Sequence, residues 1–269
     1  MSSLTTAVVL ARGLGSRMRA ASDVVLDADQ ERAADGGAKA MMPLGGRPFL
    51  DYVLSALADA GVRDVCLVIG PEHGAVREYY DARPAGRLSI GYAIQERPLG
   101  TADAVAAAES WVGSRRFVVV NGDNYYAPDA VARLGSVAGN ATLGYEREAL
   151  VALGNIPAER VAAYAILRSA GGVLTGITEK PSASEVEAAG PRALISMNCW
   201  AFTPAVFDAC RAIGPSARGE YEIADAVTTL SASGHDVRVV PVASGVLDLS
   251  SRADIAGVAA RVAGREVRL

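Results

Sequence analysis

Lys39 and Lys180 are the only lysines in the sequence, although lysine and arginine together number 26. A lysine ammonium is a compact point charge with rotatable donors, whereas arginine presents a planar fork. In an arginine-rich chain, the retained lysines therefore mark candidate sites for a point charge. Upstream of Lys39 lies a glycine loop, residues 13–17, whose main-chain N–H groups can approach an anion closely because glycine has no Cβ. Together these features predict phosphate handling.

Other short motifs add carboxylates and an amide. A carboxylate is a ligand that Mg²⁺ accepts together with phosphate oxygens, and a side-chain amide offers both a donor and an acceptor to a base edge. The motifs are Gln95 with Pro98-Leu99-Gly100-Thr101, Asn121-Gly122-Asp123, Glu179-Lys180-Pro181, and residues 218–225, Arg-Gly-Glu-Tyr-Glu-Ile-Ala-Asp.

The elements that would position these motifs follow an alternating pattern. An apolar run at residues 6–11 ends on the glycine loop, helical spacing follows at 49–60, and a second apolar run fills 65–70. This is the pattern of a strand-helix-strand unit in a parallel sheet. A later run at 117–120 delivers Asp123 to the carboxyl end of a strand, which is the edge where open α/β sheets bind ligands.

A strand is predicted at 88–95 and a helix at 101–111. After about residue 135 the predicted strands are shorter, at 141–147, 162–168, 173–179 and 194–202, followed by helices at 204–212 and 220–233, a strand at 237–242 and a helix at 251–262. Thr101 is a candidate cap for the first of these helices. The segment 20–38 has no clear period, and the sequence leaves open whether it is a mobile lid or a short helix.

Composition excludes several classes of protein. A net charge of −4 argues against a nucleic-acid partner, which requires a basic face. Three widely spaced cysteines indicate neither a disulfide framework nor a zinc site, and we expect a reducing cytoplasm. No apolar run approaches the ~20 residues that span a bilayer, so no membrane partner is expected. His73 and His235 lie in turn sequences and are interpreted as exposed turn residues without a catalytic role.

In this order the motifs resemble those of the sugar-1-phosphate nucleotidyltransferase family, which includes glucose-1-phosphate thymidylyl- and uridylyltransferases and mannose-1-phosphate guanylyltransferases. The resemblance runs from about Thr6 to Asp254. It implies a Rossmann-like three-layer α/β sandwich with a mostly parallel, mixed central sheet and a small sugar-side β subdomain. It also implies a single domain over residues 1–269, with a nucleotide-binding half to about residue 135, a sugar-binding half from about 136, and no appended repeat domain.

The resemblance also implies roles for individual residues. Catalytic roles fall to Arg17, Lys39, Asp123 and Lys180. Nucleotide binding falls to Leu10, Ala11, Gly13, Gly15, Ser16, Gln95, Gly100 and Thr101. Sugar-phosphate binding falls to Glu179, Lys180 and Asn198, and metal binding to Asp123 and Asp225.

The implied reaction joins a nucleoside triphosphate to a sugar 1-phosphate and releases pyrophosphate. The attacking oxygen is already anionic, so Mg²⁺ and cationic side chains would act mainly by holding two polyanions together. A non-catalytic subunit that senses a nucleotide or nucleotide sugar is the alternative, and a glycosyltransferase is disfavoured because no Asp-x-Asp motif follows Asn121. The nucleobase, the sugar or cyclitol phosphate, and a homo-oligomeric state stay open.

Two features depart from the family pattern. Arg12 occupies a loop position where the family typically has a small residue, and the 22-residue step from Arg17 to Lys39 is longer than usual. Arg12 would either add a phosphate contact or block one, and the sequence does not decide between these roles.

Overall fold

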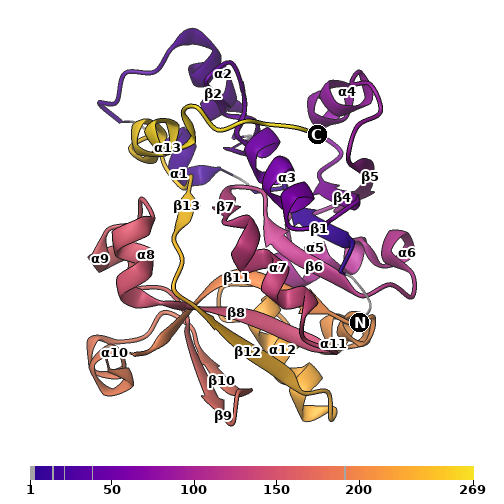
Figure 1. Cartoon of the computed structure of the whole chain (residues 1–269), viewed down its shortest axis with the longest axis vertical. Helices are drawn as coiled ribbons and strands as arrows, with labels where there is room; N and C mark the ends of the chain where they lie inside the picture. The colour runs from indigo at the N-terminus through magenta and orange to yellow at the C-terminus, as the bar shows by residue number, and fades with distance from the viewer. Residues whose placement is uncertain (1–3, 14, 21, 38, 191) are drawn as a thin grey trace.

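A nine-stranded sheet forms the centre of the computed structural model, which describes residues 4–13, 15–20, 22–37, 39–190 and 192–269 (Figure 1). Its strands are β1 (Thr6–Leu10), β4 (Asp64–Ile69), β5 (Ser89–Ile94), β6 (Phe117–Asn121), β8 (Asn140–Glu146), β9 (Ile166–Ala170), β10 (Val173–Thr178), β11 (Leu194–Phe202) and β12 (Val237–Val242). The order across the sheet is β5-β4-β1-β6-β11-β8-β12-β10-β9. Two small sheets pair β2 (Pro43–Leu44) with β3 (Arg47–Pro48), and β7 (Asn124–Tyr126) with β13 (Val246–Asp248).

The sheet is mixed, and its first four strands in spatial order, β5-β4-β1-β6, are parallel. β1 pairs in parallel with β4 and β6, and β4 with β5. β11 is antiparallel to both β6 and β8, so β8 runs in the same direction as β6. The carboxyl ends of β1 and β6 therefore share one edge, as predicted, and both halves of the chain contribute strands to one continuous sheet.

Helices cover both faces of the sheet. They are α1 (Ser16–Arg19), α2 (Ala28–Gly36), η1 (Lys39–Met41, a 3₁₀ turn), α3 (Phe49–Asp59), α4 (Gly74–Asp81), α5 (Thr101–Ala107), α6 (Glu109–Val112), α7 (Pro128–Gly135), α8 (Arg147–Leu153), α9 (Ala158–Val161), α10 (Ala183–Ala189), α11 (Ala205–Ala212), α12 (Ile223–Ala232) and α13 (Asp254–Val262). Apolar residues of α3, α7 and α13 join one buried cluster, and those of α5, α11 and α12 join the other.

Strand β1 shows why its sequence requires two covering layers. Ala7 and Val9 belong to the first cluster and Val8 to the second, and all three are fully buried. Because successive side chains of a strand point to opposite faces, a continuous apolar run is stable only when both faces are covered. The predicted three-layer α/β sandwich is confirmed.

Two predicted elements differ in the structure. The strand expected at 162–168 begins only at Ile166, because the preceding residues form the short helix α9 after Pro157 and then a turn. The single helix expected at 101–111 is two helices, α5 and α6, that meet at Ala108.

The long step between Arg17 and Lys39 is occupied by α2. The Asp27 carboxylate accepts hydrogen bonds from the N–H groups of Asp29 and Gln30, and the Gln30 side chain completes a capping box. The Arg252 guanidinium donates to the carboxylates of Glu31 and Asp35 and so holds α2 against the chain beyond β13. The segment 20–38 thus contains a docked helix, although residues 21 and 38 lie outside the described residues.

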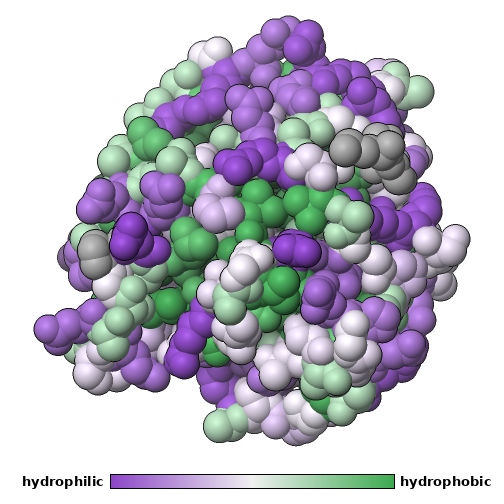
Figure 2. Space-filling view, turned by 60° about the horizontal axis from the view of Figure 1, so that its bottom comes forward, coloured by the Kyte–Doolittle hydropathy of each residue, from purple (hydrophilic) through white to green (hydrophobic). Residues whose placement is uncertain are grey.

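Figure 2 shows one face on which apolar residues, in green, gather near the centre, with hydrophilic residues, in purple, prominent above them and at the sides. Among the described residues, large hydrophobic side chains classed as exposed are Val25, Val151 and Leu153. No helix in the described part of the chain is both long and apolar enough to span a bilayer.

Candidate active site

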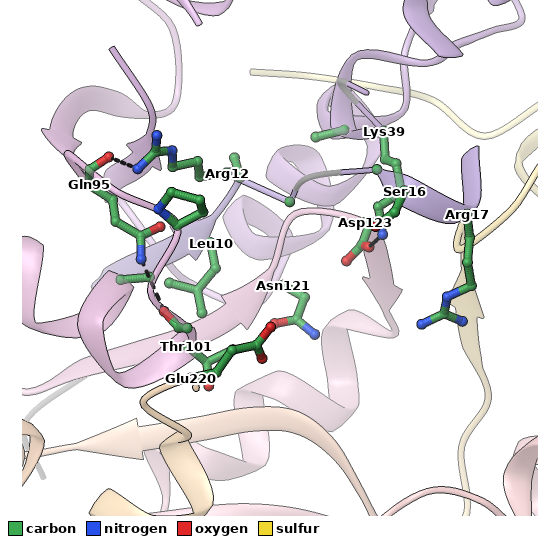
Figure 3. A pocket seen from close by; sticks show the side chains of 17 residues that line it. Leu10, Arg12, Ser16, Arg17, Lys39, Gln95, Thr101, Asn121, Asp123 and Glu220 are labelled. Carbon is green, nitrogen blue, oxygen red and sulfur yellow. Dashed lines mark hydrogen bonds and ion pairs between the residues drawn. The ribbon is translucent and has the colours of Figure 1, made fainter. Parts of the chain in front are cut away.

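A cavity of about 330 Å³ opens at the carboxyl edge of β1 and β6 (Figure 3). That volume lies within the range of small-molecule pockets, about 300–1,000 Å³. The cavity brings together the glycine loop, the loop before α5 and the end of β6. Its lining residues are Leu10, Ala11, Arg12, Gly13, Gly15, Ser16, Arg17, Lys39, Ala40, Gln95, Pro98, Gly100, Thr101, Ala104, Asn121, Asp123 and Glu220.

The glycine loop is shaped by close main-chain contacts. Gly15 has φ 62°, and a Cβ there would lie 2.5 Å from the carbonyl oxygen of Gly37 at the end of α2. A side chain at Gly15 is therefore excluded both by conformation and by space. A Cβ at Gly13 would meet Cε of Lys39 at 3.4 Å, so the lysine side chain crosses the loop at this point. Residue 14 lies outside the described part of the loop.

Lys39 and Asp123 form an ion pair inside the cavity. Nζ of Lys39 lies 2.5 Å from Oδ2 of Asp123, and the two side chains are only 16% and 22% exposed. Gly122 positions Asp123, since its N–H donates to the carbonyl oxygen of Leu10 at 2.8 Å and joins the ends of β6 and β1. The pair thus links the glycine-loop side of the cavity to the end of β6.

Gln95 lies at the opposite end of the cavity with its side-chain amide held in one orientation. It is 4% exposed, and its Nε2 donates to the carbonyl oxygen of Gly100 at 3.0 Å and to Oδ2 of Asp103 at 2.7 Å. Both partners accept hydrogen bonds, so the amide nitrogen must face them. Figure 3 shows Oε1 on the other side of the amide group. Asp103, in the first turn of α5, therefore helps to orient Gln95.

Gly100 and Thr101 connect the two halves of the chain. Gly100 has φ 121°, and a Cβ there would lie 2.5 Å from the carbonyl oxygen of Tyr221. Oγ1 of Thr101 accepts a hydrogen bond from the N–H of Ile223 at 2.9 Å. The prediction that Thr101 caps its own helix is therefore wrong: α5 has no side-chain cap, and Thr101 serves the N-terminus of α12.

The predicted sugar-phosphate residues lie outside the cavity lining. Lys180 and Asn198 have φ values of 44° and 52° and, among the described residues, are the non-glycine residues with positive φ. A lysine in this region is strained, and such strain concentrates at functional sites. Burial raises the pKa of Glu179, and the nearby Glu222 carboxylate raises it further. The charges of Arg218, Asp225 and Lys180 also act on Glu179.

Asp248, which the sequence analysis did not identify, is the acid that the fold brings beside Asp123. The pairing of β13 with β7 sets Asp248 opposite Asn124, and the N–H of Leu249 donates to the carbonyl oxygen of Asp123 at 2.9 Å. Asp248 is 4% exposed, and burial and the Asp123 charge raise its pKa. The sequence offered no usable signal, because β13 is only three residues long.

Asp225, the predicted second metal ligand, lies in the first turn of α12. It is exposed on α12, does not line the cavity, and exerts its charge on Glu179. That Asp225 binds a metal together with Asp123 stays a prediction. An acid in the first turn of a helix is usually solvated, and this position fits that description.

His73 differs from the exposed residue expected. Its side chain is only 13% exposed, and its Nδ1 accepts a hydrogen bond from the N–H of Gly70 at 3.1 Å. Burial lowers its pKa. It is a turn residue with a local structural contact.

Fold and cavity together define an α/β protein with a glycine loop lining a cavity at the carboxyl edge of its sheet, and comparison with known proteins gives its family. A model of the nucleotidyl transferase family matches residues 6–248. The chain belongs to this family.

Relatives support the same grouping. The glucose-1-phosphate thymidylyltransferase of Streptomyces griseus is 31% identical over 235 residues, which cover 86% of this chain and 59% of that protein. The UTP–glucose-1-phosphate uridylyltransferase AglF of Haloferax volcanii is 28% identical, with 90% of each chain covered. This chain thus spans less than two thirds of the Streptomyces protein.

Solved structures agree on the fold. A UDP-glucose pyrophosphorylase complexed with UDP-glucose superposes with a TM-score of 0.73 at 18% identity, covering 96% of this chain and 98% of that one. A UTP-bound enzyme from Acinetobacter baumannii gives 0.73 at 19% identity, covering 96% and 93%.

Proposed function

We propose that this protein transfers a nucleotidyl group from a nucleoside triphosphate to a sugar 1-phosphate, giving a nucleotide sugar and pyrophosphate. The observation that carries the proposal is the convergence of Arg17, Lys39 and Asp123 around a glycine loop in one cavity. The names of the Streptomyces and Haloferax relatives support a uracil or thymine base and glucose 1-phosphate as the acceptor.

The main-chain N–H groups of the glycine loop would bind the triphosphate. Arg17 lies just beyond the loop, where its fork suits phosphate oxygens. Lys39 would turn from Asp123 toward the α-phosphoryl group, because a triphosphate offers more negative charge than one carboxylate. These contacts stabilise the charge that builds up in the transition state.

The acids of this edge fit a magnesium ion. The described residues contain no group of three or more His, Cys, Asp or Glu side chains able to hold a metal by themselves. Mg²⁺ characteristically takes one or two protein carboxylates and completes its shell with water and phosphate oxygens. We therefore propose Asp123 as its ligand in the cavity, with Asp225 or Asp248 as the second carboxylate. Asp248 lies beside Asp123 but is only 4% exposed, and its carboxylate already accepts hydrogen bonds from Asn124, Tyr164 and Ser250. When bound, the ion would neutralise phosphate charge.

Lys180 would hold the acceptor phosphate, and Glu179 would accept hydrogen bonds from sugar hydroxyls. Arg218 is an additional candidate for the acceptor phosphate, since its charge acts on Glu179 and it is paired only with Glu222 among the described residues. The acceptor oxygen is already an anion, so no general base is needed. Attack on the α-phosphorus would then proceed in line without a covalent intermediate.

The test is a magnesium-dependent pyrophosphate-release assay that crosses the common nucleoside triphosphates with a panel of sugar 1-phosphates. We expect release only when both substrates are present. Triphosphate binding without release from any pair would favour the sensor alternative and overturn the proposal.

A further inference from the structure

Arg12 occupies a position of the glycine loop where a small residue is typical, and its side chain is only 7% exposed. Its Nε and Nη2 donate to the two carboxylate oxygens of Glu72 at 3.1 and 3.2 Å. Its Nη1 donates to the main-chain carbonyl oxygen of Gln95. Figure 3 shows this guanidinium at the Gln95 end of the cavity, away from Arg17 and Lys39. The Arg12 guanidinium is therefore held by Glu72 and by the main chain of Gln95.

The Arg12–Glu72 pair is built into the edge of the sheet. A Cβ on Gly70 would overlap both carboxylate oxygens of Glu72 and Nε of Arg12, so the pair lies directly over Gly70. The φ of Gly70 is not in the left-handed region, so a Cβ here would act only by displacing the ends of the Glu72 and Arg12 side chains. The pair thereby joins the glycine loop, the loop after β4 and the end of β5.

Gln95 is consequently fixed from two directions. Arg12 holds its main-chain carbonyl, while Gly100 and Asp103 hold its amide nitrogen. Its Oε1 has no hydrogen-bond partner among the described residues and is not enclosed. A base entering this end of the cavity would meet an acceptor whose position is set by Arg12 on one side and by Asp103 on the other.

We propose that Arg12, braced by Glu72, is a positioning residue that sets nucleobase selection through Gln95. The proposal rests on the proposed function, but it concerns triphosphate binding and is testable without turnover. Selectivity of this kind depends on the accurate placement of polar groups, because a misplaced group leaves a buried donor or acceptor unpaired. Loss of the Arg12–Glu72 pair should therefore weaken binding of the triphosphate with the preferred base more than binding of the other triphosphates.

The experiment measures equilibrium binding of ATP, GTP, CTP, UTP and dTTP by calorimetry, without acceptor, to the wild type, Arg12→Ala and Glu72→Gln. Glu72 is half exposed, so its variant should fold even if Arg12→Ala does not. The control is Arg87→Ala. This variant breaks a surface ion pair in which Nη2 of Arg87 lies 2.7 Å from Oδ1 of Asp59, and neither residue lines the cavity.

We expect the ratio of affinities between the best and second-best triphosphate to fall by about tenfold in both test variants and to stay unchanged in the control. Two results would overturn the proposal: an unchanged ratio in both folded variants, or equal weakening of all five triphosphates, which would make Arg12 a phosphate contact. Absence of pyrophosphate release by the wild type would count against the proposed function alone.

Discussion

Nζ of Lys39 and Oδ2 of Asp123 lie 2.5 Å apart between the glycine loop and the end of β6, where each neutralises the other. Binding of a triphosphate with Mg²⁺ would separate them, because the phosphates attract the ammonium and the metal attracts the carboxylate. In the free protein the ion pair therefore balances both charges. On substrate binding, the ammonium would exchange the carboxylate for phosphate, and the carboxylate would exchange the ammonium for Mg²⁺.

Asp123→Asn should lower kcat for nucleotidyl transfer by about 100-fold or more, which is the scale of losing one preorganised charge contact at a reacting phosphoryl group. The amide keeps the shape of the side chain but is a poor magnesium ligand. Steady-state pyrophosphate release across a magnesium titration measures the effect. A second readout is thermal stabilisation by Mg²⁺ with triphosphate, which should be present in the wild type and lost in the variant. Full activity in Asp123→Asn would exclude the assigned role.

Lys39 shows that the scarcity of a residue type in the sequence can indicate a residue of the cavity. The scarcity of lysine in the chain predicts a role for Lys39, and Lys39 lies in the cavity beside Asp123. The strands carrying the glycine loop and Asp123 were also predictable, since continuous apolar runs demand burial on both faces. For Lys39, the glycine loop and Asp123, the position expected from the sequence is therefore the position found in the fold.

Contacts between distant segments were not predictable in the same way. Thr101 has the residue type of a helix cap, but the helix it serves begins 122 residues later. Asp248 lies next to Asp123 only because β13 pairs with β7, and a three-residue strand carries too little periodicity to be recognised. The helix in the segment 20–38 has a clear capping box, but its sequence shows no regular apolar face.

Lys180→Gly should bind sugar 1-phosphate at least about tenfold more weakly, because one charge-assisted contact is lost. The same change should stabilise the fold by up to about 1 kcal/mol, since glycine adopts a φ of 44° without strain. Substrate kinetics and urea unfolding measure the two effects. Lys180→Ala is the matched variant that removes the charge without relieving the backbone, and loss of triphosphate affinity in either would contradict the division of roles.

The acceptor KM should depend on the ionisation of Glu179. Burial and the Glu222 charge raise its pKa above the ordinary value of 4.5, so the carboxylate that accepts sugar hydroxyls is protonated at a higher pH than usual. As pH falls through this raised pKa, acceptor affinity should decline and KM should rise. The ratio of KM between wild type and Glu179→Gln removes the titration of the substrate phosphate, and a ratio that does not change with pH would refute the assignment.

Gly100→Ala should destabilise the protein by about 2 kcal/mol or more, because it adds a Cβ at φ 121° and 2.5 Å from the Tyr221 carbonyl oxygen. Gly113→Ala is the control: Gly113 also has a positive φ, 60°, but a Cβ added there would meet no described atom within 4 Å, so only the conformational cost of about 1 kcal/mol applies. Chemical denaturation measures both. Because the N–H of Tyr221 bonds to Leu99 and the N–H of Ile223 to Thr101, Gly100→Ala should also weaken binding of both substrates. Equal destabilisation by the two substitutions would mean that the close contact with Tyr221 does not constrain this loop.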